Sequence, residues 1–285
     1  MTQPSGSPST PALFVDLHSH STASDGACAP AVVVREAHRL GLSAIALTDH
    51  DTTAGLAEAS AEGERLGVRL VPGVELSAVE DDQETHILGL HLHDISPIDD
   101  KLAGLRVMRR DRAMKIVELL NANGVRITFE SVLEQAGDAA IGRPHVARAL
   151  IAEGWAVDAR DAFDRYLASG RPGYVGKERL SIPDAIALIH RAGGLAIVAH
   201  PAQGGTRQRI RVLADHGLDG VEVKHPSHLP DDIQRLSALV EEFGLVPSGG
   251  SDWHGTPANQ RALGGMQIPL AWLERQDQRV RAKAA

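Results

Sequence analysis

The sequence has little of the chemistry that would place it outside a cell or in a membrane. It contains one cysteine, Cys28, in 285 residues. A single cysteine cannot form an internal disulfide and suits a reducing compartment, so we expect a cytoplasmic protein in which Cys28 only packs. No apolar run approaches the roughly 18 residues of a membrane span. The stretch 1–11 lacks the positive charge and apolar core of a signal peptide. We therefore expect no membrane partner and a disordered tail over residues 1–11.

An excess of positive charge is also missing. The formal net charge is -8 and the isoelectric point is about 5.9. Long duplex nucleic acid is held largely by basic surfaces that release counterions, and this chain has no overall basic field for that purpose. The charge balance argues against long duplex nucleic acid as a partner. A ligand that carries phosphate must then be held by a local site.

Short apolar runs alternate with helical patterns along most of the chain. With 43% hydrophobic residues, a chain of this length can bury one large core. Strand, helix and strand in repeated succession predict an α/β fold with a parallel sheet, closed or nearly closed into a barrel. The predicted strands are 12–17, 42–47, 68–74, 85–92, 195–199, 220–223 and 245–247, and the predicted helices between them are 31–40, 53–66, 206–215 and 231–242.

The middle of the chain breaks this alternation. Residues 99–179 are helical and charged in pattern, and the longest periodic segment is 101–120. We interpret 99–179 as a helical insertion between two parts of a barrel, 12–98 and 180–285. Its basic residues fit either a solvated helix face or a lid that meets an anionic substrate.

The first predicted strand ends in a pair of histidines, His18 and His20. Side chains two apart in a strand point the same way, so the two imidazoles converge on one point. Convergent neutral imidazoles are a metal-ligand arrangement, although one such pair often has no ligand role. The pair gains weight from the residues at the other strand ends.

Histidines and carboxylates recur where most of the other predicted strands end, and His86 lies on the fourth predicted strand, 85–92. In parallel α/β folds the residues just past the carboxyl ends of the strands meet on one face. The set suits Mn²⁺, Fe²⁺ or Zn²⁺, and its lack of thiolates argues against a structural cysteine–zinc site. The candidate ligands are His18, His20, Asp25, His50, Glu75, His86, His200, Asp252 and His254.

These motifs, in this order and over almost the whole chain, resemble the PHP (polymerase and histidinol phosphatase) superfamily. The resemblance implies a distorted (β/α)₇ TIM-like barrel and three divalent metal ions, with Mn²⁺ expected first and Fe²⁺ or Zn²⁺ as alternatives. Asp49 is expected to orient a ligand histidine. The implied assignment gives one ion His18, His20, Glu75 and Asp252, a second Glu75, His86 and His200, and a third Asp25, His50 and His254.

The charge of such a centre points to its substrate class. Three divalent ions carry about six positive charges, which three carboxylates and a bridging hydroxide reduce to about two. A phosphate monoester dianion matches this charge. Closely spaced metal ions also activate water and stabilise both oxygens of an in-line displacement, so phosphoester hydrolysis is the expected reaction.

The insertion carries a narrower resemblance. Segments 141–150 and 163–177 are similar to the bacterial PHP branch that contains 3′,5′-nucleoside bisphosphate phosphatases and 5′→3′ exoribonucleases. By that resemblance Arg143 and Lys177 bind the substrate and contribute to catalysis, the Arg as a bidentate fork and the Lys as a point charge. Asp25 and His254 are alternative sources of the proton for the leaving oxygen, and His228 is a further candidate for substrate contact.

We therefore expect an enzyme that hydrolyses the 3′-phosphate of nucleoside 3′,5′-bisphosphates and shortens 5′-phosphorylated RNA. Its partner would be a small phosphorylated nucleotide or a short oligonucleotide. A histidinol-phosphate phosphatase, or another small phosphomonoesterase, is the closest alternative. A non-catalytic metal-binding module is the alternative of a different class, and it would be expected to have lost ligands.

Overall fold

A mixed sheet is the scaffold of the barrel part in the computed structural model, which describes residues 14–80, 83–137, 141–176, 180–255 and 261–284. Neighbouring strands follow the order β8-β7-β6-β4-β3-β2-β1-β9, and β5 pairs with β3. The strands are β1 (Phe14–Asp16), β2 (Ala44–Leu47), β3 (Arg69–Glu80), β4 (Gln83–Leu90), β5 (Leu180–Ser181), β6 (Leu195–Val198), β7 (Gly220–Lys224), β8 (Val246–Gly249) and β9 (Ile268–Pro269).

The sheet is not parallel throughout, and here the expectation of a parallel sheet is wrong. Strand β4 runs antiparallel to both of its neighbours, β3 and β6, and β9 runs antiparallel to β1. Strand β3 ends at Glu80 and β4 begins at Gln83. A connection this short allows only an antiparallel pair, because a parallel crossover needs a dozen or more residues.

The two ends of the sheet approach each other. The backbone N–H of Leu17, just after β1, donates to the carbonyl of Gly249 at the end of β8 over 3.1 Å. Ser19 and Trp253 form a parallel bridge just beyond. The sheet is thus a nearly closed barrel, which confirms the predicted α/β barrel class and brings the residues after β1 and β8 together.

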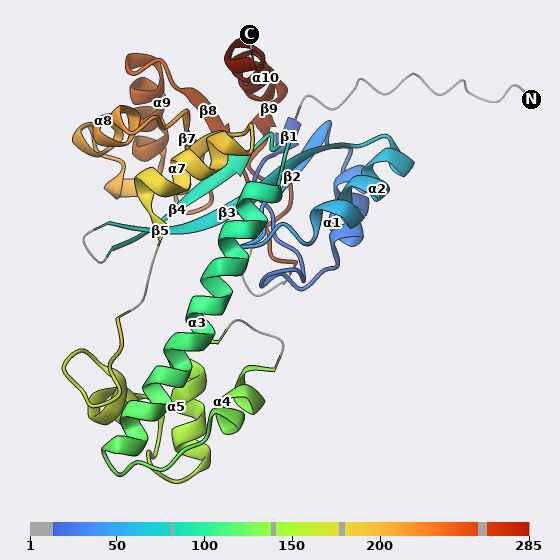
Figure 1. Cartoon of the computed structure of the whole chain (residues 1–285). Coiled ribbons are helices and arrows are strands. Elements are labelled where there is room, and N and C mark those ends of the chain that lie inside the picture. The colour runs from blue at the N-terminus through green and yellow to red at the C-terminus, as the bar shows by residue number, and fades with distance from the viewer. Residues whose placement is uncertain (1–13, 81–82, 138–140, 177–179, 256–260, 285) are drawn as a thin grey trace, which may run out of the picture. The chain divides into compact units, whose positions relative to one another are not determined.

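Helices α1 and α2 pack beside β2 (Figure 1). Pro30 stands in the first turn of α1, where its fixed φ suits a helix start, and α2 ends at Gly67 with a left-handed φ of 70°. Their apolar residues Val33 and Ala59 share a core cluster with Ile45 of β2. The helices of the barrel part are α1 (Pro30–Arg39), α2 (Leu56–Leu66), α7 (Ile182–Arg191), α8 (Arg207–Asp215), α9 (Pro230–Glu242) and α10 (Leu270–Ala284), with a short 3₁₀ turn at Ala202–Gly204.

The chain divides into two compact units. One comprises Met1–Asp99 with Leu180–Ala285, and the other is Asp100–Arg179. The second unit has its own core, in which Ile116, Leu120, Val146 and Leu150 are buried. That the two units are separate domains stays a prediction. Helix α3 (Ser96–Ala122) leads into the second unit, which also contains α4 (Phe129–Ala136), α5 (Arg143–Ala152), α6 (Ala159–Ala162) and a π-helical turn at Phe163–Leu167.

Among the described residues, none of the helices combines the length and the apolar character needed to cross a membrane. The predicted tail over 1–11 lies outside the described residues.

Candidate metal centre

The candidate ligands come from separate segments that the barrel brings to one edge. His18 and His20 follow β1, and His50 follows β2. Glu75 lies within β3 and His86 within the antiparallel β4, where His86 is paired with Ser77. The remaining ligands follow later strands: His200 comes after β6, and Asp252 and His254 come after β8.

Four of these side chains form a buried, tightly packed group. The Nε2 atoms of His18 and His20 lie 3.0 Å and 3.2 Å from Glu75 Oε2 and 3.4 Å and 3.0 Å from Asp252 Oδ1. The two Nε2 atoms are themselves 3.1 Å apart. A tetrahedral ion with ligand bonds of 2.0–2.1 Å keeps its ligand atoms roughly 3.3 Å apart. These four residues therefore fit the first expected metal position.

Glu75 also faces a second group through its other oxygen. Its Oε1 atom lies 2.7 Å from His86 Nδ1 and 3.1 Å from His200 Nε2. His86 Nδ1 is buried and has no hydrogen-bonded partner among the described residues. A nitrogen close to a carboxylate oxygen but outside hydrogen-bonding geometry is the arrangement of two ligands around a shared ion. His50 joins this group, since its Nδ1 lies 3.4 Å from Glu75 Oε2.

A third group surrounds Asp25, whose side chain is exposed. His254 Nε2 lies 3.3 Å from Asp25 Oδ1, and His50 Nε2 lies 3.9 Å from Asp25 Oδ2. His20 adds its second ring nitrogen, Nδ1, at 3.7 Å from Asp25 Oδ1. The ligand atoms of these four residues all lie within 4.8 Å of one another. His20 and His50 thus face two groups each, and the structure brings all nine predicted ligands into one connected cluster.

The cluster holds two of its carboxylates, Glu75 and Asp252, in the charged form. Burial alone would raise the pKa of Glu75, but the charge of His18 and hydrogen bonds from His18, His20 and His200 hold it well below its usual range. The pKa of Asp252 is lowered in the same way, against burial, chiefly by His20 and His225. Ionised carboxylates are the ligand form that a divalent cation requires.

Two of the ligands have a strained backbone. His200 and Asp252 adopt left-handed φ angles of 30° and 50°. Such conformations cost roughly 1–3 kcal/mol each in residues other than glycine, and they concentrate at functional sites. Gly250 permits the close approach of the β8 segment, because a Cβ there would lie 2.4 Å from His18 Cβ. The left-handed backbone at His200 and Asp252 therefore costs stability and serves the site.

Glu222, in the middle of β7, supports the cluster and was not predicted from the sequence. Its Oε1 accepts a hydrogen bond from His18 Nδ1 at 3.0 Å, and its Oε2 accepts one from the backbone N–H of His200 at 2.6 Å. The proton on His18 Nδ1 leaves the Nε2 lone pair free to face the metal position. Carboxylates that fix a ligand histidine in this way also tune metal affinity. The only hint in the sequence is a glutamate between two valines of an apolar strand.

Asp49 and Asp16 hold the backbone around the cluster. Asp49 accepts hydrogen bonds from the N–H and hydroxyl of Ser21, both at 2.7 Å, and from the hydroxyl of Ser24 at 2.6 Å. The expectation that Asp49 orients a ligand histidine is therefore corrected: its side chain fixes the loop that carries His20 and Asp25. Buried Asp16 accepts from the backbone N–H groups of His18, Ser251 and Gly264.

Two residues that follow β7 and β8, His225 and Arg261, contact Asp252, and His228 also follows β7. His225 Nε2 lies 3.2 Å from Asp252 Oδ2, and Arg261 is ion-paired with the same carboxylate. Both ring nitrogens of His228 are engaged with backbone groups, those of Ala202 and Val223. His228 thus holds its loop, and contact with a substrate would require one of these bonds to break. Substrate contact by His228 stays a prediction.

Arg143, one of the two substrate-binding residues predicted in the insertion, lies in the unit Asp100–Arg179. Arg143 opens α5, donates to the carbonyl of Leu167 at 3.3 Å, and lies over the rings of Phe163 and Tyr174 at 5.6 Å and 5.9 Å. Lys177 lies outside the described residues.

Comparison with known proteins places these features in a family. The PHP domain model matches residues 16–170. The chain is 37% identical over 251 residues to the 5′-3′ exoribonuclease Rnm of Escherichia coli (strain K12), covering 85% of this chain and 86% of that one. It is 36% identical over 257 residues to the 3′,5′-nucleoside bisphosphate phosphatase of Chromobacterium violaceum, covering 88% and 90%.

A solved structure agrees with this relationship. A Bifidobacterium adolescentis protein, named for metal-dependent phosphoesterase activity, superimposes with a TM-score of 0.66 at 33% identity and covers 93% of this chain and 96% of its own. The resemblance drawn from the sequence motifs is thereby confirmed, and the chain belongs to the PHP domain family.

Proposed function

We propose that this protein is a metal-dependent phosphoesterase that removes the 3′-phosphate of nucleoside 3′,5′-bisphosphates such as adenosine 3′,5′-bisphosphate. The same cut, made at the first internucleotide phosphate, would shorten a 5′-phosphorylated RNA from its 5′ end. The observation that carries this proposal is the continuous cluster of nine histidines and carboxylates centred on Glu75. The names of the two relatives supply the substrate class.

The donor set fits divalent metal ions, and we propose three of them, with Mn²⁺ first. The three overlapping groups within the cluster support that number. Imidazole and carboxylate donors without thiolate suit Mn²⁺, Fe²⁺ or Zn²⁺. Ions bound there supply positive charge to the non-bridging phosphate oxygens and lower the pKa of a nearby water.

The protein side chains would have separate roles in binding and catalysis. Glu75 and Asp252 hold the buried positions, and Glu222 keeps His18 in the tautomer that faces them. Asp25 and His254, 3.3 Å apart at the exposed side of the cluster, are the two alternatives that we propose for giving a proton to the leaving 3′ oxygen. Arg143 and Lys177 are proposed to bind the 5′-phosphate as the bidentate and point-charge partners. We place the enzyme in the cytoplasm, because a chain with the single cysteine Cys28 suits a reducing compartment.

The test compares three substrates with Mn²⁺ present. Phosphate release is measured from adenosine 3′,5′-bisphosphate and from histidinol phosphate, and nucleotide release is measured from a short 5′-phosphorylated RNA. We expect the bisphosphate and the RNA to be turned over and histidinol phosphate to be a poor substrate. A preference for histidinol phosphate would instead support the alternative phosphatase, and no turnover of any substrate would favour a non-catalytic module.

Metal analysis accompanies this assay. We expect about three equivalents of manganese per chain after loading, and loss of turnover in Asp252→Asn. Fewer than two equivalents, together with full activity of Asp252→Asn, would contradict a polynuclear centre.

A further inference from the structure

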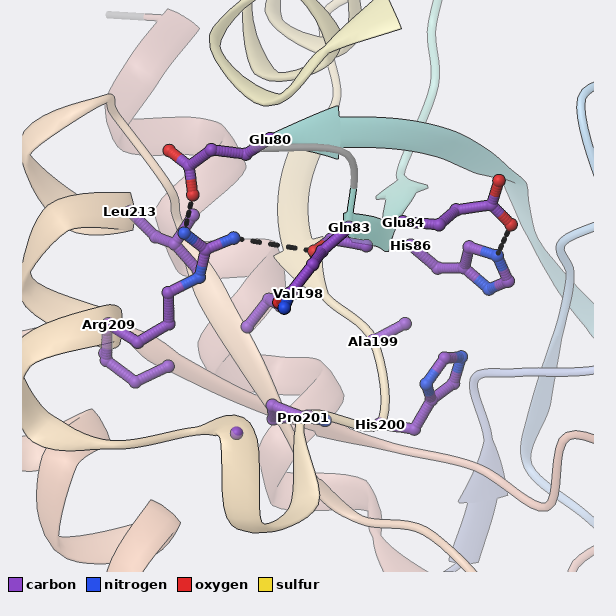
Figure 2. A pocket seen from close by; sticks show the side chains of 13 residues that line it. Glu80, Gln83, Glu84, His86, Val198, Ala199, His200, Pro201, Arg209 and Leu213 are labelled. Carbon is purple, nitrogen blue, oxygen red and sulfur yellow. Dashed lines mark hydrogen bonds and ion pairs between the residues drawn. The ribbon is translucent and has the colours of Figure 1, made fainter. Parts of the chain in front are cut away.

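A cavity of about 570 Å³ adjoins the metal centre within the barrel unit. It lies between β4, the end of β6 and helix α8, and two of the candidate ligands, His86 and His200, form one of its ends. Figure 2 shows Arg209 and Glu80 paired at the other end, away from these histidines. Because His86 and His200 face both the cavity and Glu75, a group attached to a phosphate at the metal centre can extend into this space.

The walls of the cavity are of two kinds. Apolar side chains of β6 and α8, among them Val198, Ile210 and Leu213, provide one surface. Polar groups provide the other: Thr85 and Gln83 of β4 lie near Arg209, whose Nη2 is 3.5 Å from Thr85 Oγ1. An occupant should therefore have an apolar face and polar edges, and the volume falls within the range of small-molecule sites, about 300–1,000 Å³.

The charges of the lining argue against a second phosphate in this space. Arg209 is ion-paired with Glu80, and His86 Nε2 lies 3.4 Å from Glu84 Oε1. His200 is close to Glu75. Each of these basic groups thus has a carboxylate beside it, which offsets its positive charge and would repel a second phosphate. The pairing favours an uncharged group, and the Arg209–Glu80 pair offers donors and acceptors to its polar edges.

We propose that this cavity, the β4–α8 pocket, receives the nucleoside that follows the scissile phosphate of an RNA substrate. The proposal rests on the proposed function and deepens it, because it assigns a place to the part of an RNA that a nucleoside bisphosphate lacks. Single-stranded RNA is recognised through contacts with base faces and base edges, which match the two kinds of wall.

The chemistry explains why one site would serve both substrates. In each case water adds to phosphorus, the bond from phosphorus to the 3′ oxygen breaks, and that oxygen takes up a proton. The leaving group is a nucleoside 5′-phosphate in both reactions. With a bisphosphate the other product is inorganic phosphate, and with RNA the phosphate stays on the 5′ oxygen of the next nucleoside, the group that the β4–α8 pocket would hold.

The experiment introduces a large side chain into the β4–α8 pocket at a position that has room for one. Gly204 lines the pocket, and a Cβ built there meets nothing within 4 Å. We compare kcat/KM for the 5′-phosphorylated dinucleotide pApA with kcat/KM for adenosine 3′,5′-bisphosphate in wild type and Gly204→Phe. The matched control is Ala61→Phe on the exposed face of α2.

We expect Gly204→Phe to reduce kcat/KM for pApA at least tenfold more than for the bisphosphate, and Ala61→Phe to leave the ratio of the two unchanged. An equal loss on both substrates, or no loss on either, overturns the assignment of the pocket. Wild-type turnover of neither substrate refutes the proposed function itself, so the two failures are distinguishable.

A second pair of variants covers the case in which Gly204→Phe does not fold. Arg209→Met removes the guanidinium from the pocket, and Arg211→Met makes the same change two residues along α8, at an exposed residue outside the lining. We expect the pApA-to-bisphosphate ratio to fall severalfold in Arg209→Met and to stay at the wild-type value in Arg211→Met. The same ratio in both variants overturns the proposal.

Discussion

At the scale of single residues, Glu222 is the clearest case of a side chain that acts through another. It has no exposure to solvent, and it binds both the ring of His18 and the backbone of His200. Burial alone would raise the pKa of Glu222, but the charge and hydrogen bond of His18 hold it below its usual value. The residue is therefore an ionised acceptor, and its role is to position ligands.

Glu222→Gln should weaken metal binding before it affects the reaction. The amide can donate to His18 Nδ1 and favour the tautomer whose Nε2 proton points at the metal position. Loss of such a partner typically costs about 10- to 100-fold in metal affinity. We expect a fall of this size in a Mn²⁺ titration, with most of kcat recovered at saturating Mn²⁺.

Glu241→Gln is the control for this prediction. Glu241 is an exposed residue of α9 that pairs with Arg275, and it is not one of the candidate ligands. It should bind Mn²⁺ like the wild type. An affinity in Glu222→Gln equal to that of the control would show that Glu222 only fills the core.

At the scale of elements, the C-terminal helix α10 is tied to the barrel by a buried carboxylate. Asp219, just before β7, lies 2.7 Å from His190 Nε2 of α7 and 2.5 Å from Lys283 Nζ of α10. It also accepts from the backbone N–H of Ala196 at 3.0 Å. Burial alone would raise the pKa of Asp219, but these hydrogen bonds and the charge of Lys283 lower it below its usual value.

The contribution of this carboxylate to stability should depend on pH with a definite sign. A group whose folded-state pKa is depressed stabilises the fold above its unfolded pKa, which is 3.8 for Asp, and loses that contribution as pH falls through the folded value. Asp219→Asn should therefore lower the free energy of unfolding by about 1.5–3 kcal/mol at neutral pH. Urea unfolding at several pH values measures the effect. A difference between variant and wild type that stays constant from pH 7 to below pH 3 would contradict it.

The sequence predicted some elements well and others poorly, for physical reasons. Most of the ligands were recognisable because they lie in short patterns just after an apolar run, as at His18 and His20, whereas His86 lies within a strand. The strand at β4 was predicted, but its direction was not, because periodicity says nothing about which strands become neighbours. Glu222 was missed because its partners, His18 and His200, are distant in sequence and become neighbours only when the barrel closes. The grouping of ligands was predicted only in part, since His20 and His50 each present two nitrogens to different groups.

At the scale of the whole molecule, the two compact units have separate hydrophobic cores. One cluster, around Leu120 and Leu150, lies wholly within Asp100–Arg179, whereas the clusters around Leu88 and Ile45 lie within the barrel unit. All nine candidate ligands belong to the barrel unit. A ligand that binds only folded protein stabilises the part that carries its site, by about 2.7 kcal/mol at a concentration of 100 times Kd.

Calorimetry with and without Mn²⁺ should therefore reveal two unfolding transitions that respond differently to the metal. We expect Mn²⁺ to raise the Tm of the barrel transition by several degrees, as follows from about 2.7 kcal/mol in a unit of this size, and to leave the transition of residues 100–179 nearly unchanged. Asp252→Asn serves as the control, because it removes a ligand oxygen and should abolish most of the shift. A single transition that moves as a whole with Mn²⁺ would mean that the units unfold together, and the insertion would then be energetically part of the barrel.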